Sequence, residues 1–227
     1  MVHEPNLAEN QLAGMRMNYG GAPGSSDELD ETSLNEGWAP LLRRWLDFAI
    51  VAPVVEPNAM VLATVDAEGY PASRMVLCKG LSAAGVVFYT NYGSDKAKQL
   101  DAVPYASATF GWPAIGRQVT LRGSVERVDP EITAEYWRTR PRGSQLGAWA
   151  SQQSRPIGSR ADLERALIEV MTRFDAAEHI PLPPNWGGYI LRPSSAEFWQ
   201  GRENRLHNRI RATVDSSGEW TAMRLQP

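Results

Sequence analysis

Cysteine and histidine are scarce in this chain of 227 residues. Cys78 is the only cysteine, so no disulfide can form within the chain and no cluster of thiolates can hold a metal. His3, His179 and His207 are the only histidines, and they are too scattered to predict a zinc or iron centre. We therefore expect no metal site.

Long apolar runs and an excess of basic residues are missing as well. No apolar run approaches the ~20 residues that a membrane-spanning helix needs. The N-terminus lacks the basic and then apolar layout of a signal peptide. Lys and Arg number 23 against 26 Asp and Glu, a net charge of -3, whereas nucleic-acid-binding domains are usually basic. We expect a cytoplasmic protein with no nucleic-acid or membrane partner.

The chain is long enough to fold without disulfide or metal staples. Residues 1–34 are polar and rich in Gly, Asn, Asp, Glu and Ser, so burial offsets little of the entropy lost on ordering them. We predict a mobile N-terminal arm over residues 1–34. Residues 35–227 are predicted to form a single domain.

Apolar spacing in residues 35–227 changes from a helical period to a period of two. Helices are predicted from Trp38 to Ala49, from Ser94 to Leu100, from Asp129 to Arg140 and from Ser159 to Phe174. Nine β-rich runs lie between and after them, which predicts a mainly β protein with inserted helices (α+β), a small closed or split barrel. The predicted strands are residues 60–65, 72–78, 86–90, 106–112, 118–128, 188–191, 196–200, 206–213 and 220–225.

No glycine-rich phosphate loop is present, so side chains must hold any phosphate. The first basic cluster is the apolar run from Arg74 to Lys79, which has a cation at each end. Side chains alternate along a strand, so these two cations should point to opposite faces unless the strand bulges or ends between them. An edge strand guarded by charges is as good an interpretation as two separate anion sites.

A second cluster consists of Tyr136, Arg140 and Ser144. Tyr136 and Arg140 share one helical face, and Ser144 lies just beyond Pro141, where the chain turns. A phenol, a guanidinium and a hydroxyl that converge would clamp a phosphate. Taken alone, a Tyr–Arg pair on a helix is more often a solvated face.

The third cluster alternates Arg205, His207 and Arg209. A strand would project all three from one face. Adjacent cations repel one another, so a bound anion would relieve the cost of placing them together. The structural alternative is that acidic neighbours pair with them.

These clusters lie inside motifs that resemble the pyridoxamine 5′-phosphate oxidase family. The C-terminal signature is Phe198-Trp199-Gln200-Gly201 followed by Arg205-Leu206-His207-Asn208-Arg209. The similarity runs in order from about Leu41 to the C-terminus. Further matching motifs are residues 74–79, 88–91, 93–94, 117–119, 140–142, 144–149 and 152–154.

The resemblance implies a homodimeric split β-barrel with FMN at the subunit interface. It places Arg74 and Lys96 on the FMN phosphate, with Gln153 and Ser154 coming from the neighbouring subunit. The FMN-binding residues that it implies are Arg74, Met75, Val76, Leu77, Cys78, Lys79, Tyr89, Thr90, Lys96, Gln118, Gln153, Ser154, Trp199 and Arg209.

The resemblance also implies a site for a vitamin B6 phosphate. Arg205 and His207 would be catalytic and lie over the pyridine ring, and the stretch from Arg16 to Tyr19 resembles an arm that covers the substrate. The implied substrate-binding residues are Arg16, Tyr19, Lys79, Tyr136, Arg140, Ser144, Arg205 and His207.

The implied reaction is the FMN-dependent oxidation of pyridoxine 5′-phosphate or pyridoxamine 5′-phosphate by O2. The products would be pyridoxal 5′-phosphate, H2O2 and, from the amine, NH3. A flavin or deazaflavin reductase on the same scaffold and a non-catalytic binder remain alternatives. Asp95 departs from the family, which commonly has a basic residue there, and this predicts weaker FMN binding.

Overall fold

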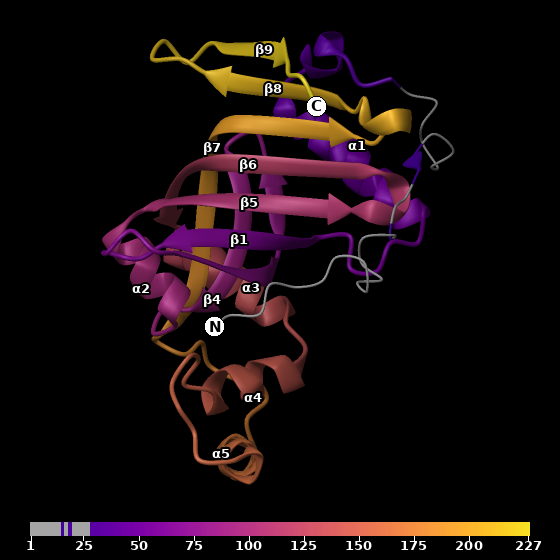
Figure 1. The fold of residues 1–227 in the computed structure, drawn as a ribbon. Coiled ribbons are helices and arrows are strands. Elements are labelled where there is room, and N and C mark those ends of the chain that lie inside the picture. The colour runs from indigo at the N-terminus through magenta and orange to yellow at the C-terminus, as the bar shows by residue number, and fades with distance from the viewer. Residues whose placement is uncertain (1–14, 16–17, 20–27) are drawn as a thin grey trace, which may run out of the picture.

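The computed structural model describes Met15, Asn18, Tyr19 and residues 28–227 (Figure 1). Nine strands of this part of the chain form one antiparallel sheet in the order β2-β1-β5-β6-β7-β4-β3, with β8 added on β7 and β9 on β8. The mainly β fold with inserted helices is confirmed. The strands are β1 (Ala59–Val65), β2 (Pro71–Leu77), β3 (Gly80–Ser82), β4 (Gly85–Asn91), β5 (Tyr105–Trp112), β6 (Arg117–Arg127), β7 (Trp186–Gln200), β8 (Asn208–Val214) and β9 (Trp220–Arg224).

β7 joins the two halves of the sheet. Its first residues pair with β4 and its last residues pair with β8, while β6 follows it along both parts. We predicted two strands here, residues 188–191 and 196–200, on either side of Pro193. The structure instead has one strand, whose register with β6 shifts between Arg122 and Gly123, opposite Pro193. A bulge tolerates proline because the ladder hydrogen bond is already broken there.

Alternation divides the side chains of the sheet between two faces. The inner face carries the core, including Leu62, Phe110, Phe198 and Ile210, and helix α1 (Trp38–Val51) packs its apolar stripe against this core. The other face carries a row in register that runs Met75, Val61, Thr109, Thr120, Glu197, Arg211. We call it the outer face.

The remaining helices gather at one end of the sheet (Figure 1). They are α2 (Asp95–Ala102), α3 (Pro130–Thr139), α4 (Arg142–Ala150) and α5 (Arg160–Arg173). A second apolar cluster, centred on Trp137, Leu146, Phe174 and Trp186, holds α3, α4 and the segment after α5 together. α4 was not predicted, because Pro141 and Gly143 obscure its start.

The predicted arm is too long at its C-terminal end. Residues 28–34 include the 3-10 helix η3 (Glu31–Leu34), which is capped by Asp30. Leu29 and Leu34 are buried in the main core. Two leucines separated by polar residues were enough to anchor this segment, although its composition had suggested a loop. Most of residues 1–27 lie outside the described residues.

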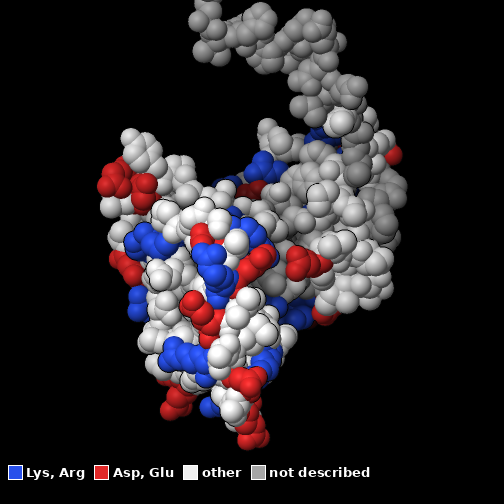
Figure 2. All heavy atoms as spheres, turned by 90° about the horizontal axis from the view of Figure 1, so that it is seen from below, with Lys and Arg blue, Asp and Glu red and all other residues white. Residues whose placement is uncertain are grey.

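Charges of both signs are intermingled on the face of the molecule seen in Figure 2, as the nearly balanced composition implies. Among the described residues, no helix has the length and apolar character needed to cross a membrane. The same residues contain no group of three or more His, Cys, Asp or Glu that could hold a metal ion.

Candidate active site

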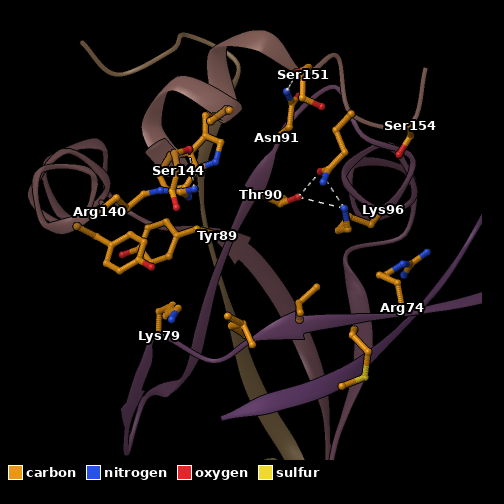
Figure 3. A pocket seen from close by; sticks show the side chains of 18 of the residues that line it. Arg74, Lys79, Tyr89, Thr90, Asn91, Lys96, Arg140, Ser144, Ser151 and Ser154 are labelled. Atoms are coloured by element: carbon orange, nitrogen blue, oxygen red, sulfur yellow. Dashed lines mark hydrogen bonds between the residues drawn. The ribbon is translucent and has the colours of Figure 1, made fainter. Parts of the chain in front are cut away.

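A cavity of about 920 Å³ lies between β2, β4, α2, α4 and the segment that follows α4. Figure 3 shows it with Arg74 at one end and Lys79 and Arg140 toward the other. We call it the main pocket. Its lining residues are Arg74, Met75, Val76, Leu77, Lys79, Tyr89, Thr90, Asn91, Asp95, Lys96, Tyr136, Arg140, Pro141, Ser144, Gly147, Ala148, Ser151, Gln153, Ser154 and Trp186.

Arg74 and Lys79 therefore do not serve opposite faces of a strand. β2 ends at Leu77, and the chain turns so that Lys79 donates its backbone N–H to Val87 in β4. Both cations line the same pocket, at its two ends (Figure 3). The alternation rule stops applying where the strand stops.

Two cations meet at the Arg74 end of the pocket. Arg74 donates to Thr64 Oγ1 (2.6 Å) and to Gln99 Oε1 (2.9 Å). The Lys96 ammonium is buried and donates to Thr90 Oγ1 (3.1 Å) and Ser94 Oγ (3.3 Å). Burial lowers the pKa of both groups, and Arg74 lowers the pKa of Lys96 further. An anion placed here would offset both costs.

Gln153 and Ser154 belong to the same end of the same chain's pocket. The Gln153 side-chain oxygen accepts from Lys96 Nζ (3.1 Å) and from Thr90 Oγ1 (3.0 Å), as the dashed lines in Figure 3 mark. We expected these two residues from a neighbouring subunit. Within one chain they already line this end of the pocket, because the turn after α4 brings Ser151 to Asn91 of β4 and Gln153 to Lys96 of α2.

Arg140 and Lys79 mark the other end, with Tyr136 and Ser144 beside them. The Arg140 guanidinium donates to the backbone oxygen of Ser144 (3.1 Å) and lies over the ring of Trp186 (4.6 Å). Its Nε is buried without a hydrogen-bond partner, and burial lowers the pKa of the group. The residue itself lines the main pocket beside Lys79, so its guanidinium is placed to meet an anion bound at this end.

An aromatic stack forms the wall at this end of the pocket. The ring of Tyr89 lies 4.0 Å from that of Tyr136 and 5.3 Å from that of Trp186, nearly parallel to both. Burial raises the pKa of both tyrosines, so they are neutral hydrogen-bonding groups at pH 7. Trp186 was not predicted, since Pro183 and Pro184 before it suggested only a connector.

Not all of the FMN-binding residues predicted over residues 75–78 line the main pocket. Met75, Val76 and Leu77 line the main pocket, and β2 is an edge strand whose free backbone groups face solvent or a ligand. Cys78 does not line the pocket. Its thiol is buried in the core, donates to the backbone oxygen of Gly80 (3.2 Å) and has its pKa raised by burial.

Gln118, Trp199 and Arg209 lie elsewhere, side by side on the outer face of β6, β7 and β8. Arg209 donates twice to Glu197 Oε1 (2.7 and 3.0 Å). Burial acts to raise the pKa of Glu197, but hydrogen bonds from Arg209 and Arg211 hold it below its usual range. For Arg209, the alternative of pairing with an acidic neighbour is confirmed.

Arg205 and His207 do not lie on a strand, contrary to the predicted alternation. Arg205 ends the 3-10 helix η5 (Glu203–Arg205) with a φ of 63°, and β8 begins only at Asn208. His207 packs on Trp199, with the ring centroids 4.6 Å apart. Asn204, also at positive φ, turns the chain before a strand can form.

The contacts of His207 fix its protonation state. Its Nδ1 lies 3.0 Å from the backbone nitrogen of Arg202. A backbone N–H can only donate, so Nδ1 is the acceptor and the ring proton is on Nε2. Burial, followed by the charge of Arg205, lowers the pKa of His207. The side chain is a neutral imidazole at pH 7.

Tyr19 reaches this second cluster from the N-terminal segment. Its ring makes edge contacts with Trp199 (5.4 Å) and His207 (6.0 Å). Gly201 leaves room for it, since a Cβ there would collide with the Tyr19 ring. Arg16 lies outside the described residues. We call Tyr19, Trp199, Arg205 and His207 the outer cluster; none of them lines the main pocket.

Comparisons with known proteins decide the family. Residues 46–173 match the family described as Pyridoxamine 5′-phosphate oxidase, and residues 186–227 match the Pyridoxine 5′-phosphate oxidase C-terminal dimerisation region. The chain belongs to the pyridoxamine 5′-phosphate oxidase family. This confirms the resemblance drawn from the motifs.

Close relatives and solved structures agree with this membership. A pyridoxine/pyridoxamine 5′-phosphate oxidase of Nocardia farcinica is 62% identical over 223 residues, 95% of this chain and 98% of the relative. One of Mycolicibacterium paratuberculosis is 55% identical, over 98% of this chain and 100% of the relative. The structure of PhzG from Burkholderia lata, in complex with tetrahydrophenazine-1-carboxylic acid, has a TM-score of 0.81 and 30% identity, over 88% and 98% of the two chains.

Proposed function

We propose that this chain is an oxidase that uses FMN and O2 to convert pyridoxine 5′-phosphate and pyridoxamine 5′-phosphate to pyridoxal 5′-phosphate. H2O2 is the second product, and the amine also consumes water and releases NH3. Family membership supports an oxidoreductase of this class. The observation that carries the proposal is a single pocket with cationic side chains at each of its two ends, Arg74 and Lys96 at one and Lys79 and Arg140 at the other.

The pocket fits FMN in size and in chemistry. A volume of about 920 Å³ is near the upper end of the usual range for ligand pockets, roughly 300–1,000 Å³. Arg74 and Lys96 would hold the FMN phosphate, and the edge of β2 offers backbone groups for the polar rim of the ring. FMN, when bound, supplies the acceptor for the hydrogen and two electrons that leave the substrate.

The second phosphate site would orient the substrate. Arg140 and Lys79 supply charge, and Tyr136 and Ser144 supply hydroxyls for the phosphate oxygens. The stacked rings of Tyr89 and Tyr136 form an apolar wall at this end. Holding the phosphate in this way would fix the distance between the reacting carbon and the ring bound at the other end.

The outer cluster would complete the site across a dimer interface. Residues 186–227, which carry β7, β8 and β9, match a dimerisation region. Met75 lines the main pocket, belongs to the outer face and is 63% exposed. Pairing of two outer faces would cover such apolar surface and bring the outer cluster of one copy to the pocket of the other.

Within that arrangement, Arg205 and His207 have different roles. Arg205 would position C4′ of the substrate and stabilise charge that develops during oxidation. His207 would donate from Nε2–H, because its Nδ1 is occupied by the Arg202 N–H. It would not act as a strong base at neutral pH.

A coupled assay tests the proposal. Purified protein is mixed in air with FMN and pyridoxine 5′-phosphate, and pyridoxal 5′-phosphate and H2O2 are followed together. We expect equal amounts of the two products and much slower turnover of unphosphorylated pyridoxine. Flavin binding without either product would contradict the oxidase and favour a reductase or a binder.

A further inference from the structure

Asp95 is the one acidic side chain among the described residues that line the main pocket. It begins α2, next to Lys96, and its charge acts on both Arg74 and Lys96. A free carboxylate at this position would repel a phosphate. The sequence therefore predicted weaker FMN binding, and the surroundings of Asp95 decide whether that prediction holds.

The Asp95 carboxylate has a partner of its own. Arg155 Nη2 lies 2.7 Å from Asp95 Oδ1 and 3.3 Å from the backbone oxygen of Gly93. Arg155 immediately follows Gln153 and Ser154 in the turn after α4. One guanidinium thus connects the start of α2 to the turn that carries two pocket residues.

Charge balance gives this contact a function. Arg74, Lys96 and Arg155 carry three positive charges, and Asp95 removes one of them. The remaining two positive charges match a phosphate monoester, which carries about -1.5 to -2 at pH 7. Without Arg155, the same end would hold a single net positive charge and an unpaired carboxylate.

The backbone of the turn also requires support. Ser154 has a φ of 69°, a left-handed conformation that a non-glycine residue adopts at a cost. Gln153 reaches Lys96 and Thr90 from this turn, and Asn91 donates to the backbone oxygen of Ser151 (3.3 Å). The Arg155–Asp95 pair adds a charged contact on the other side of Ser154.

We propose that Arg155 is a positioning residue for the cofactor phosphate: it neutralises Asp95 and ties residues 153–154 over the Arg74–Lys96 end of the pocket. This inference rests on the proposed binding of FMN in the main pocket. Arg155 does not line the pocket and acts through Asp95 and the turn. The pair is largely exposed, at 39% and 61% of the two side chains, so its loss should spare the fold.

Flavin binding by the full-length protein tests this role without reference to turnover. The dissociation constants of FMN and of riboflavin, which lacks the phosphate, are measured from flavin fluorescence for wild type and for Arg155→Ala. We expect FMN binding to weaken about five- to tenfold, because the unpaired carboxylate then faces the phosphate. Riboflavin binding should not change.

Two further variants make the test specific. Asp95→Asn in the Arg155→Ala background should recover most of the lost FMN affinity, because it removes the unpaired charge. Arg160→Ala breaks the ion pair with Glu164 on α5, away from the pocket, and should leave both constants at wild-type values.

Wild-type FMN affinity in Arg155→Ala would overturn the role of Arg155 and leave the proposed function intact. Equal weakening of FMN and riboflavin, or no recovery with Asp95→Asn, would also overturn it, because either result indicates a general structural effect. Wild-type protein that binds riboflavin as tightly as FMN would contradict the phosphate site itself, and the proposed function with it.

Discussion

Arg140 lies at one end of the main pocket with few partners of its own. Its guanidinium stacks on Trp186, makes one hydrogen bond to Ser144 and leaves Nε buried without a partner. Lys79, Tyr136 and Ser144 line the pocket beside it. This convergence supports the phosphate site more strongly than the Tyr136–Arg140 spacing in the sequence did.

Arg140→Ala should raise the KM for pyridoxine 5′-phosphate about tenfold to a hundredfold, since a charge-assisted hydrogen bond contributes about 1.5–3 kcal/mol. Steady-state kinetics measures this, and FMN content should stay at the wild-type level. Arg138→Ala, on the exposed side of α3, is the matched control. An unchanged KM for Arg140→Ala would remove this residue from the phosphate site.

Arg205→Leu should separate turnover from cofactor binding. Loss of one group that stabilises developing charge lowers kcat by about a hundredfold, while the FMN dissociation constant should stay near that of wild type. Rapid-reaction kinetics of flavin reduction and a fluorescence titration give the two values. Arg205→Lys, which keeps the charge, should retain part of the rate. Equal loss of flavin would contradict the assigned role.

His207 should titrate below the usual histidine pKa of about 6.5, because burial and Arg205 both disfavour its charged form. A pKa lowered by folding gives stability that is present above the unfolded value and lost as the pH falls through the folded value. NMR of the imidazole nitrogens should show a proton on Nε2 at pH 7. A doubly protonated ring at that pH would contradict the Arg202 hydrogen bond.

The motifs predicted the residues of the site better than the periodicity predicted the bounds of helices and strands. Arg74, Lys79, Tyr89, Thr90, Lys96, Tyr136, Arg140, Ser144, Gln153 and Ser154 were predicted and line one pocket. Trp186 could not be predicted, because its place in the pocket wall comes from stacking on Tyr89, 97 positions earlier in the chain. Such a contact exists only once β4 and β7 pair.

At the scale of elements, periodicity predicted strands and helices where one face is buried. It failed where the pattern is broken locally: Pro193 hid the continuity of β7, and Pro141 hid the start of α4. It also extended β8 back to Leu206, because alternation alone does not show that Asn204 and Arg205 adopt positive φ. These failures lie beside the site, where the chain departs from regular structure.

In the loop between β7 and β8, Gly201 lies against the ring of Tyr19. Gly201→Ala should displace this ring, because a Cβ at 201 occupies its position. Loss of an aromatic contact worth about 0.5–1.5 kcal/mol predicts a rise in substrate KM of about two- to tenfold. Tyr19→Ala should have the same effect, and the double variant should add nothing. Additive effects would contradict the shared contact.

At the scale of the whole molecule, the predicted site residues form two groups. One group lines the main pocket, and the other lies on or beside the outer face, where its members contact one another. Cys78 belongs to neither group because it is buried in the core, and Arg16 lies outside the described residues. Sequence motifs could not show this division, since they carry no information about which copy supplies which residue. The match of residues 186–227 to a dimerisation region supports a second copy as the source of the second group.

Subunit complementation tests this account most directly. A pocket variant, Lys79→Ala with Arg140→Ala, and an outer-cluster variant, Arg205→Leu, are each expected to be nearly inactive at low substrate concentration. After denaturation and refolding together in equal amounts, we expect about a quarter of wild-type activity, because half of the dimers are mixed and each mixed dimer has one intact site of two. A mixture that refolds into dimers, binds FMN and stays as inactive as its components would contradict a site built from two copies.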